Sequence, residues 1–410
     1  MADAKLATAP HTIRLVFSEE VVPALSQILV IGPAGDSTKL NVTNDPHDVH
    51  TLLGAVSQSK SGGRYTVYWR VVSADGHPVN GNFSFSVAGA AVSGGVTTVP
   101  TPIDTTPKRD SIARPVDLQN ADEVPVTAAV LRGVGLGVLM AAVGILFFGL
   151  TARDTDGAPV LPRGLILWLT LIGAVLLVAH LIAWTRLIAP NSVSNTAFVT
   201  SVFESKVGRI ELARTALAVL MLLSVAPLGN NKLAFLFGFA CLLVSGAVGH
   251  PAAIHPMWAI PGKSIHLLSG AAWLGALVWL LATARADDAT HQREAMRVSS
   301  LALIAVIAVL VSGLLQTVLF LNTPGELLHS QYGKLVVAKF IGLLILVCYG
   351  AYNRYFLLPR FTTGGSVRLR SSVRQEIFVM TLVVLMGGFL AYIPPPPSPI
   401  AGTSVTRGLE

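Results

Sequence analysis

The pattern of hydrophobic and polar positions changes near residue 124 of the chain. From Val124 onward, long apolar runs alternate with short charged loops, whereas the apolar runs of the first 123 residues are short. A helix needs about 20 mostly apolar residues to cross the hydrocarbon of a bilayer. The pattern therefore predicts a helical membrane region that follows a domain of another kind.

The apolar runs predict eight membrane spans. Pro251, Pro256 and Pro261 fall in the apolar stretch after the fourth run, and because proline breaks a helix interior we expect a short loop before the fifth span. We expect an all-α polytopic bundle of about eight transmembrane helices at 124–395 and a proline-rich outer tail at 396–410. The expected spans are 126–150, 164–184, 208–228, 233–250, 264–284, 298–321, 335–353 and 377–393.

Short alternating runs near the start of the chain predict β-strands. Ile13, Leu15 and Phe17 alternate with other residues, and turns rich in glycine separate the runs that follow. Several short strands in about 90 residues predict a small all-β sandwich or Greek-key barrel at 1–90. Residues 91–123 are rich in Ala, Gly, Ser, Thr and Pro, which predicts a linker. The later β-like runs are Gln27–Ile31, Tyr65–Val72 and Asn82–Val87.

Charge supports the membrane interpretation and sets an orientation. Only 12% of residues are charged, against about 25% in soluble domains. The loops after spans 1, 3, 5 and 7 hold eleven Lys and Arg residues, and the remaining loops with the tail hold five. By the positive-inside rule the first set is cytoplasmic, so the β-domain and both termini are expected outside. The formal charge of +7 lies in these loops, and no basic patch with interleaved aromatic residues predicts nucleic-acid binding.

Cysteines and terminal segments add little chemistry. Cys241 and Cys348 both fall in apolar runs and are interpreted as small core residues. No apolar segment typical of a signal peptide follows Met1, so we expect that a leader has been removed from this exported chain.

No phosphate-binding Gly-x-x-x-x-Gly-Lys-Ser/Thr loop is present, and we expect a transport or binding protein and not an enzyme.

One turn carries residues suited to a metal. Asp75 and His77 flank Gly76 directly after a predicted strand. Carboxylate oxygen and imidazole nitrogen in a tetragonal arrangement suit Cu(II). An Asp-Gly-His sequence taken alone is also an ordinary turn, so the motif needs support from its surroundings.

The surrounding residues resemble a known family. Phe17–Ser18–Glu19, the run WRVVSADGHPVNG from Trp69 to Gly81, and Phe83–Ser84–Phe85 are similar to CopC, a periplasmic copper-binding protein with a cupredoxin-like or immunoglobulin-like Greek key. The resemblance covers 2–88 and implies that Asp75 and His77 bind copper, with the Glu19 carboxylate near the metal. Mature CopC proteins begin with a copper-binding histidine. This chain begins Met1–Ala2–Asp3, so a weaker Cu(II) site is expected.

The remainder of the chain, 124–395, resembles the membrane partner CopD, so the whole looks like a CopC–CopD fusion. The Gly-His pair at His250 and the segment from His266 to Gly275 carry this resemblance. His255 and Met257 lie between them in an expected outer loop. Imidazole and thioether ligands suit Cu(I), and we expect these four residues to contact copper. The alternative is that they are interfacial side chains in a hydrated loop.

Several polar residues fall within the expected spans, where they are costly in lipid and are expected to face the bundle interior. They could line a path for an ion. Glu211 could instead neutralise Arg214 at i, i+3, and Arg132 could extend outward to the interface. These residues are Arg132, His180, Glu211, Arg214, Gln316 and Lys339.

These observations predict a copper-binding integral protein of the cytoplasmic membrane. It would capture copper ions outside, from a periplasmic or extracellular copper donor, and import them through the lipid bilayer. One alternative is a haem-binding electron carrier or cupric reductase with ligands among His180, His250 and His266, since histidines on neighbouring helices can bind haem iron. Another is a copper resistance or sensing factor that transports nothing.

Overall fold

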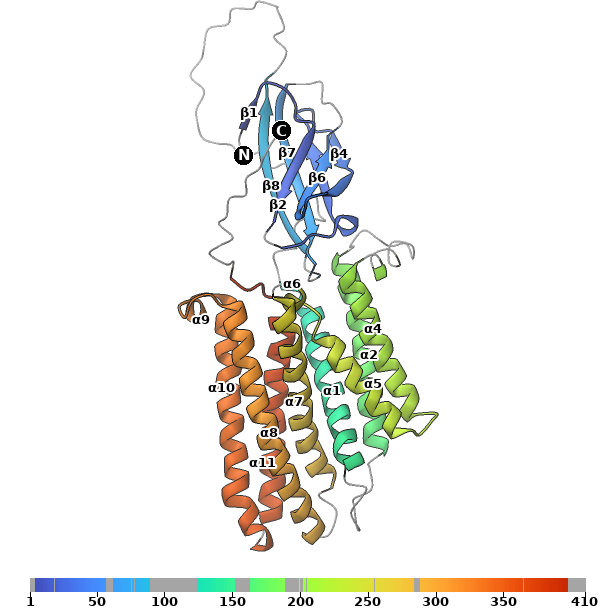
Figure 1. The fold of residues 1–410 in the computed structure, drawn as a ribbon, viewed down its shortest axis with the longest axis vertical. Coiled ribbons are helices and arrows are strands. Elements are labelled where there is room, and N and C mark those ends of the chain that lie inside the picture. The colour runs from blue at the N-terminus through green and yellow to red at the C-terminus, as the bar shows by residue number, and fades with distance from the viewer. Residues whose placement is uncertain are drawn as a thin grey trace, which may run out of the picture. The chain divides into compact units, whose positions relative to one another are not determined.

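The computed structural model describes residues 4–17, 19–56, 62–74, 76, 78–88, 124–151, 163–188, 199, 202–203, 205–253, 255–283, 288–363 and 365–396. The chain divides into a unit of β-strands and a unit of helices that begins at Val124 (Figure 1).

The β unit is a sandwich of two sheets. One sheet has the strand order β1-β8-β7-β3-β4, in which β1 pairs parallel to β8 and the other neighbours are antiparallel. The second sheet has the order β2-β6-β5 and is antiparallel. The predicted all-β sandwich is confirmed. The strands are β1 (Ala4–Leu6), β2 (Thr12–Val16), β3 (Gln27–Ile31), β4 (Ser37–Leu40), β5 (Val42–Asp45), β6 (Asp48–Ala55), β7 (Gly63–Val72) and β8 (Pro78–Val87).

The core of the sandwich follows the alternation in the sequence. Ile13 and Leu15 of β2 are buried against Ile28 and Val30 of β3, and Arg14 between the first two is exposed. Side chains two apart on a strand share one face, so each strand contributes one apolar face to the core.

An aromatic contact fixes the strand pair that leads to the Asp-Gly-His turn. The rings of Phe17 and Trp69 meet edge to face, with their centroids 5.3 Å apart. Gly81 lies opposite Trp69 in the β7–β8 register. A Cβ atom on Gly81 would lie only 2.4 Å from the Trp69 ring, so this position requires glycine.

The helical unit is built from long helices that run side by side (Figure 1). Short helices α6 (His250–Ala253) and α9 (Glu326–His329) lie before α7 and α10. Turns of η3 (Asn353–Leu357) and η4 (Leu358–Thr363) follow α10. The long helices are α1 (Val126–Thr151), α2 (Arg163–Ile188), α4 (Lys206–Val225), α5 (Asn231–Ser245), α7 (Pro256–Ala282), α8 (Asp288–Phe320), α10 (Gln331–Tyr352) and α11 (Gly365–Leu390).

All eight expected spans are helical, but the predicted number of membrane spans is not confirmed. Among the described residues, six helices are long and apolar enough to cross a membrane: α1, α2, α7, α8, α10 and α11. At about 1.5 Å per residue, α5 with its 15 residues is shorter than the hydrocarbon layer. The α4 helix contains Lys206, Arg209, Glu211 and Arg214, which lower its hydropathy.

The expected break before the fifth span is shorter than predicted. Pro256 is the first residue of α7, a position that needs no backbone N–H, and Pro261 lies inside the helix. The helix therefore starts at Pro256 and carries Lys263 and His266 in its N-terminal part. The expectation that Pro261 breaks the apolar stretch before the fifth span is wrong, because the helix continues through this residue.

The α1 and α7 helices approach each other closely at two glycines. A Cβ atom on Gly144 would lie 2.1 Å from the Ala271 carbonyl oxygen, and one on Gly275 would lie 2.2 Å from the Gly144 Cα. Small residues permit such backbone contact between membrane helices. This contact helps to position α7, whose N-terminal half forms part of the cavity described below.

Candidate functional site

Asp75 and His77, the predicted copper ligands of the β unit, lie outside the described residues. Gly76 between them has a φ of 86°, which favours glycine, and its N–H donates to the Ser73 carbonyl at 2.9 Å. The Glu19 segment runs beside the start of this turn, because the Ala74 N–H donates to the Glu20 carbonyl at 2.8 Å. Glu19 itself is partly buried.

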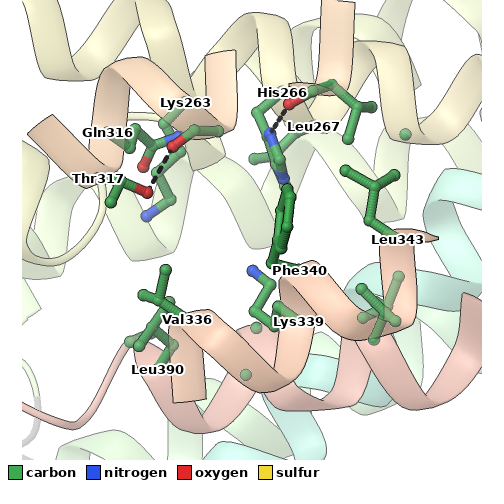
Figure 2. Close-up of a pocket in the computed structure, with 18 of the residues that line it drawn as sticks. Lys263, His266, Leu267, Gln316, Thr317, Val336, Lys339, Phe340, Leu343 and Leu390 are labelled. Carbon is green, nitrogen blue, oxygen red and sulfur yellow. Dashed lines mark hydrogen bonds between the residues drawn. The ribbon is translucent and has the colours of Figure 1, made fainter. Parts of the chain in front are cut away.

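The helical unit contains a cavity of about 430 Å³ near the N-terminal ends of α7 and α10. Side chains from α1, α7, α8, α10 and α11 line it, and most of them are apolar (Figure 2). Of the four predicted membrane ligands, His250 and His266 line this cavity.

The hydrogen bonds of His266 leave one ring nitrogen available. Its Nδ1 lies 3.2 Å from the Val309 carbonyl oxygen and 3.1 Å from the Ser312 hydroxyl. A carbonyl oxygen only accepts, so we assign the proton to Nδ1. The Nε2 lone pair has no hydrogen-bond partner among the described residues, and in Figure 2 this nitrogen is turned toward Phe340 and Lys339. A histidine whose other nitrogen is held in this way is oriented to bind a metal.

His250 is held differently, at the end of the cavity beside Tyr332. Its Nε2 donates to the Ile393 carbonyl at 2.9 Å, and its ring lies against that of Tyr332 with the centroids 6.2 Å apart. Only 4% of its surface is exposed. The segment after α11 therefore fixes His250, which begins the short helix α6.

Two methionines that the sequence analysis did not select also line the cavity. Met140 of α1 and Met380 of α11 are each buried to the same degree, with 4% of their surface exposed. Thioether sulfur, like imidazole nitrogen, is a neutral ligand suited to Cu(I). A methionine in an apolar helix has the same pattern as any core residue, so the sequence offered no signal for either one.

The other two predicted membrane ligands lie elsewhere. His255 precedes α7 with a left-handed φ of 50° and is exposed, and Met257 is 75% exposed. Neither lines the cavity. The expected outer cluster is therefore divided, with two members in the cavity and two on the surface.

Beside the cavity lies a buried charge network centred on Glu211. Arg214 donates to its carboxylate at 2.5 Å, and the Arg132 guanidinium lies 3.8 Å from it. The predicted i, i+3 pair of Glu211 and Arg214 is confirmed. The alternative that Arg132 reaches outward to the interface is wrong, because it is only 5% exposed and turns toward Glu211.

His180 belongs to this network and not to the cavity. Arg214 donates to its Nδ1 at 3.1 Å, and its Nε2 lies 2.8 Å from the Tyr392 hydroxyl. Both ring nitrogens are therefore engaged. The haem interpretation needs a histidine with a free nitrogen, and His180 does not supply one in this arrangement.

The charges that line the cavity all have one sign. Arg132, Lys263 and Lys339 contribute to its wall, whereas no Asp or Glu is among its described lining residues. Lys263 was placed in a loop by the sequence analysis, but it lies on α7 and donates to the Val248 carbonyl at 2.5 Å. Lys339 was expected to face the bundle interior, and it does.

No group of three or more His, Cys, Asp or Glu side chains that could hold a metal ion occurs in the part of the chain that the structure describes. A closed, high-affinity metal centre of that kind is not formed by these residues. The cavity instead presents the His266 Nε2 and the thioethers of Met140 and Met380, which are neutral donors, and His250 also lines it.

Comparisons with known proteins identify domains in both units. Residues 1–88 match the family model described as CopC domain, and residues 292–390 match that of Copper resistance protein D, CopD. The chain is 27% identical to Copper transport protein CutJ of Bacillus subtilis over 97% of this chain and 73% of CutJ.

Two relatives from Escherichia coli each match one part of the chain. Protein YobA is 38% identical over 21% of this chain and 70% of its own length. Inner membrane protein YebZ is 30% identical over 43% of this chain and 62% of its own length.

Proposed function

Because this chain belongs to the family of proteins that join a CopC domain to a CopD domain, we propose that it imports copper across the cytoplasmic membrane. A copper-related membrane role follows from these domains and from the six apolar helices. Transport is supported by the similarity to CutJ, which is named a copper transport protein. The location is supported by the similarity to YebZ, which is named an inner membrane protein.

The β unit is proposed to capture copper outside the cell. The distribution of Lys and Arg residues supports a cytoplasmic position for the loops after the first, third, fifth and seventh predicted spans, and so an outer position for the β unit. Asp75 and His77 are the proposed ligands, and the Glu19 segment is held beside the turn that leads to them. Three oxygen and nitrogen donors suit Cu(II), so copper captured here would need one electron from a reductant outside the protein before it entered the membrane path as Cu(I).

One observation carries the proposed membrane path: His266 presents an unprotonated Nε2 to a cavity that Met140, Met380 and His250 also line. A permeating ion must lose its water and find ligands that hold it without trapping it. Neutral imidazole and thioether donors do this for Cu(I), since they attract a soft monovalent ion without adding negative charge.

The chemistry proposed for this cavity is transfer between ligands and not catalysis. Cu(I) would enter from the outer end near His250, exchange to His266 and the methionine sulfurs, and leave toward the cytoplasmic half. The copper ion is cargo at each of these steps, and no bond of the protein changes. The thiol groups are not needed in this proposal. Cys348 lies on the exposed surface, so its interpretation as a core residue is wrong, and the buried Cys241 donates to the Arg214 carbonyl at 3.3 Å.

Uptake of radioactive copper into proteoliposomes tests this proposal. Purified protein would be reconstituted, and Cu(I), kept reduced, and Cu(II) would be supplied separately, with protein-free liposomes as the control. We expect saturable entry of Cu(I) in excess of the control. Copper that binds to the proteoliposomes without reaching their interior would support a sensing or resistance factor and overturn the transport proposal.

A further inference from the structure

Positive charge gathers around the cavity without matching negative charge. Lys263 interacts electrostatically with Arg132, Arg214 and Lys339, and with one carboxylate, Glu211. Four cationic side chains therefore share one carboxylate within the membrane part of the protein. In a medium of low dielectric constant, burying a charge without a partner costs roughly several kcal/mol of free energy.

The Glu211 carboxylate already interacts with both arginines, Arg214 and Arg132. Glu211 accepts from Arg214 at 2.5 Å and lies 3.8 Å from Arg132. Lys263 donates to a neutral carbonyl, that of Val248. Lys339 has neither a hydrogen bond nor an ion pair with any residue that the structure describes, and its ammonium lies near the backbone of Gly387.

The two lysines face a common space. Figure 2 shows the ammonium groups of Lys263 on α7 and Lys339 on α10 turned into the pocket from opposite walls. Gln316 of α8 lies beside Lys263 in the same view, and it too has no hydrogen-bond partner among the described residues. An anion between these helices would therefore accept bonds from several directions.

We propose that this cavity binds a phosphate group, with Lys263 and Lys339 as its charged donors and Gln316 as a neutral donor. Several convergent cationic donors favour an anion with more than one oxygen, because each oxygen accepts a separate charge-assisted hydrogen bond. Arg132 lines the same cavity and adds to the positive potential. This site does not depend on copper passing through the cavity.

The phosphate group could belong to a lipid or be free in solution. Leu310, Leu314 and Phe340 line the cavity and are also exposed on the surface of α8 and α10, where lipid is expected. An acyl chain could lie along these residues while the headgroup reaches the lysines. Free inorganic phosphate would reach the same lysines from the outer side. The two sources present the same chemistry to the protein.

A bound anion would also change the electrostatic potential that a copper ion experiences in the cavity. Fixed positive charges repel Cu(I), and the interaction of unit charges is strong where water is excluded. A phosphate group beside Lys263 and Lys339 would offset this repulsion. Copper and the anion would then bind with positive coupling, and each would raise the affinity for the other.

Thermal unfolding of the full-length protein tests the anion site. Protein stripped of lipid would be held in neutral detergent and titrated in one arm with sodium phosphate against sodium chloride of equal ionic strength. The other arm compares phosphatidylglycerol with diacylglycerol, which carries the same acyl chains without a phosphate group. We expect a saturable rise in Tm of roughly 2–4 °C or more in at least one arm. A response to the lipid alone identifies a headgroup, and a response to phosphate identifies a free anion.

Two variants of α10 make the assignment specific. Lys339→Gln should lose most of the rise in Tm, whereas Lys334→Gln, at an exposed position of the same helix, should keep it. Lys339→Arg should also keep it. Lys263→Gln removes the other charged donor and should also lose most of the rise, so it replaces Lys339→Gln if the latter does not fold. The proposal is overturned if neither ligand raises Tm above its control, or if Lys339→Gln responds as the wild type does. Copper uptake is not part of this readout, so failure here leaves the transport proposal standing.

Discussion

Arg214 and Glu211, one turn apart on α4, form a hydrogen-bonded ion pair at 2.5 Å in which both side chains are almost fully buried. His180 and Arg132 complete the surroundings of the carboxylate from α2 and α1. The pair thus joins three helices around one negative charge.

Removal of that charge should destabilise the helical unit strongly. Glu211→Gln leaves Arg214 and Arg132 buried without a counter-charge, which costs about 3–5 kcal/mol for a broken buried pair. Thermal or denaturant unfolding in detergent measures the effect. Glu326→Gln is the control, since Glu326 accepts only an exposed bond, from the Asn322 N–H. Equal stability of both variants would show that Glu211 is not the charge on which the network depends.

The glycine contact between α1 and α7 predicts a second loss of stability. Gly144→Ala places a methyl group 2.1 Å from the Ala271 carbonyl oxygen, so the helices must separate, at a cost of about 1–3 kcal/mol. Gly350→Ala is the matched control, because a Cβ atom there meets nothing within 4 Å. It should be neutral or stabilising by up to about 1 kcal/mol, since alanine favours a helix more than glycine does. If the two variants unfold alike, the close contact is not present in the protein.

The methionines of the cavity should contribute to Cu(I) affinity. Replacing a residue that only orients a metal ligand commonly lowers metal affinity by about 10–100-fold. Met140→Leu and Met380→Leu each remove a ligand itself, so each should lower the Cu(I) affinity by at least about tenfold. Competition with a Cu(I) chelator of known affinity measures this. Met221→Leu controls for the change of side chain, because Met221 is buried but does not line the cavity. Wild-type affinity in both cavity variants would remove the sulfurs from the path.

Acid should loosen the start of β6 in the β unit. The Thr51 hydroxyl and the His50 backbone N–H both donate to Asp48 and lower its pKa below the ordinary value of 3.8. A carboxyl group whose pKa falls on folding stabilises the protein above its unfolded pKa and loses this contribution as pH falls through the lowered value. The protection of the β6 amides against hydrogen exchange, relative to the intrinsic exchange rate at each pH, should fall on acidification more in the wild type than in Asp48→Asn. An equal fall in protection in both would show that Asp48 has no part in it.

The sequence was sufficient for the elements whose pattern is local. Alternation at Ile13 and Leu15 predicted the strand and its buried face, and spacing of three residues predicted the Glu211–Arg214 pair. These follow from the periods of strands and helices, which need no knowledge of other segments. The eight helical segments were found for the same reason, although two of them fall short of a membrane span.

The arrangement of the cavity could not be predicted in this way. It depends on which faces of five helices meet, and a face is chosen by packing between segments far apart in the chain. Met140 and Met380 have the pattern of core residues until α1 and α11 are placed together. His255 and His266 look alike as outer histidines, and only the start of α7 at Pro256 separates the exposed one from the one in the cavity.

Copper uptake by a variant of His266 tests the central claim, that copper crosses the membrane part through this cavity. Proteoliposomes with His266→Ala, with His329→Ala, and with Cys241 and Cys348 both changed to Ser would be compared with the wild type at equal protein content. His329 is an exposed histidine on the outer helix α9, outside the cavity lining, so its variant controls for the loss of a surface imidazole. We predict that His266→Ala abolishes saturable Cu(I) entry while the other two variants keep the wild-type rate. Wild-type uptake by a folded His266→Ala protein would contradict the account.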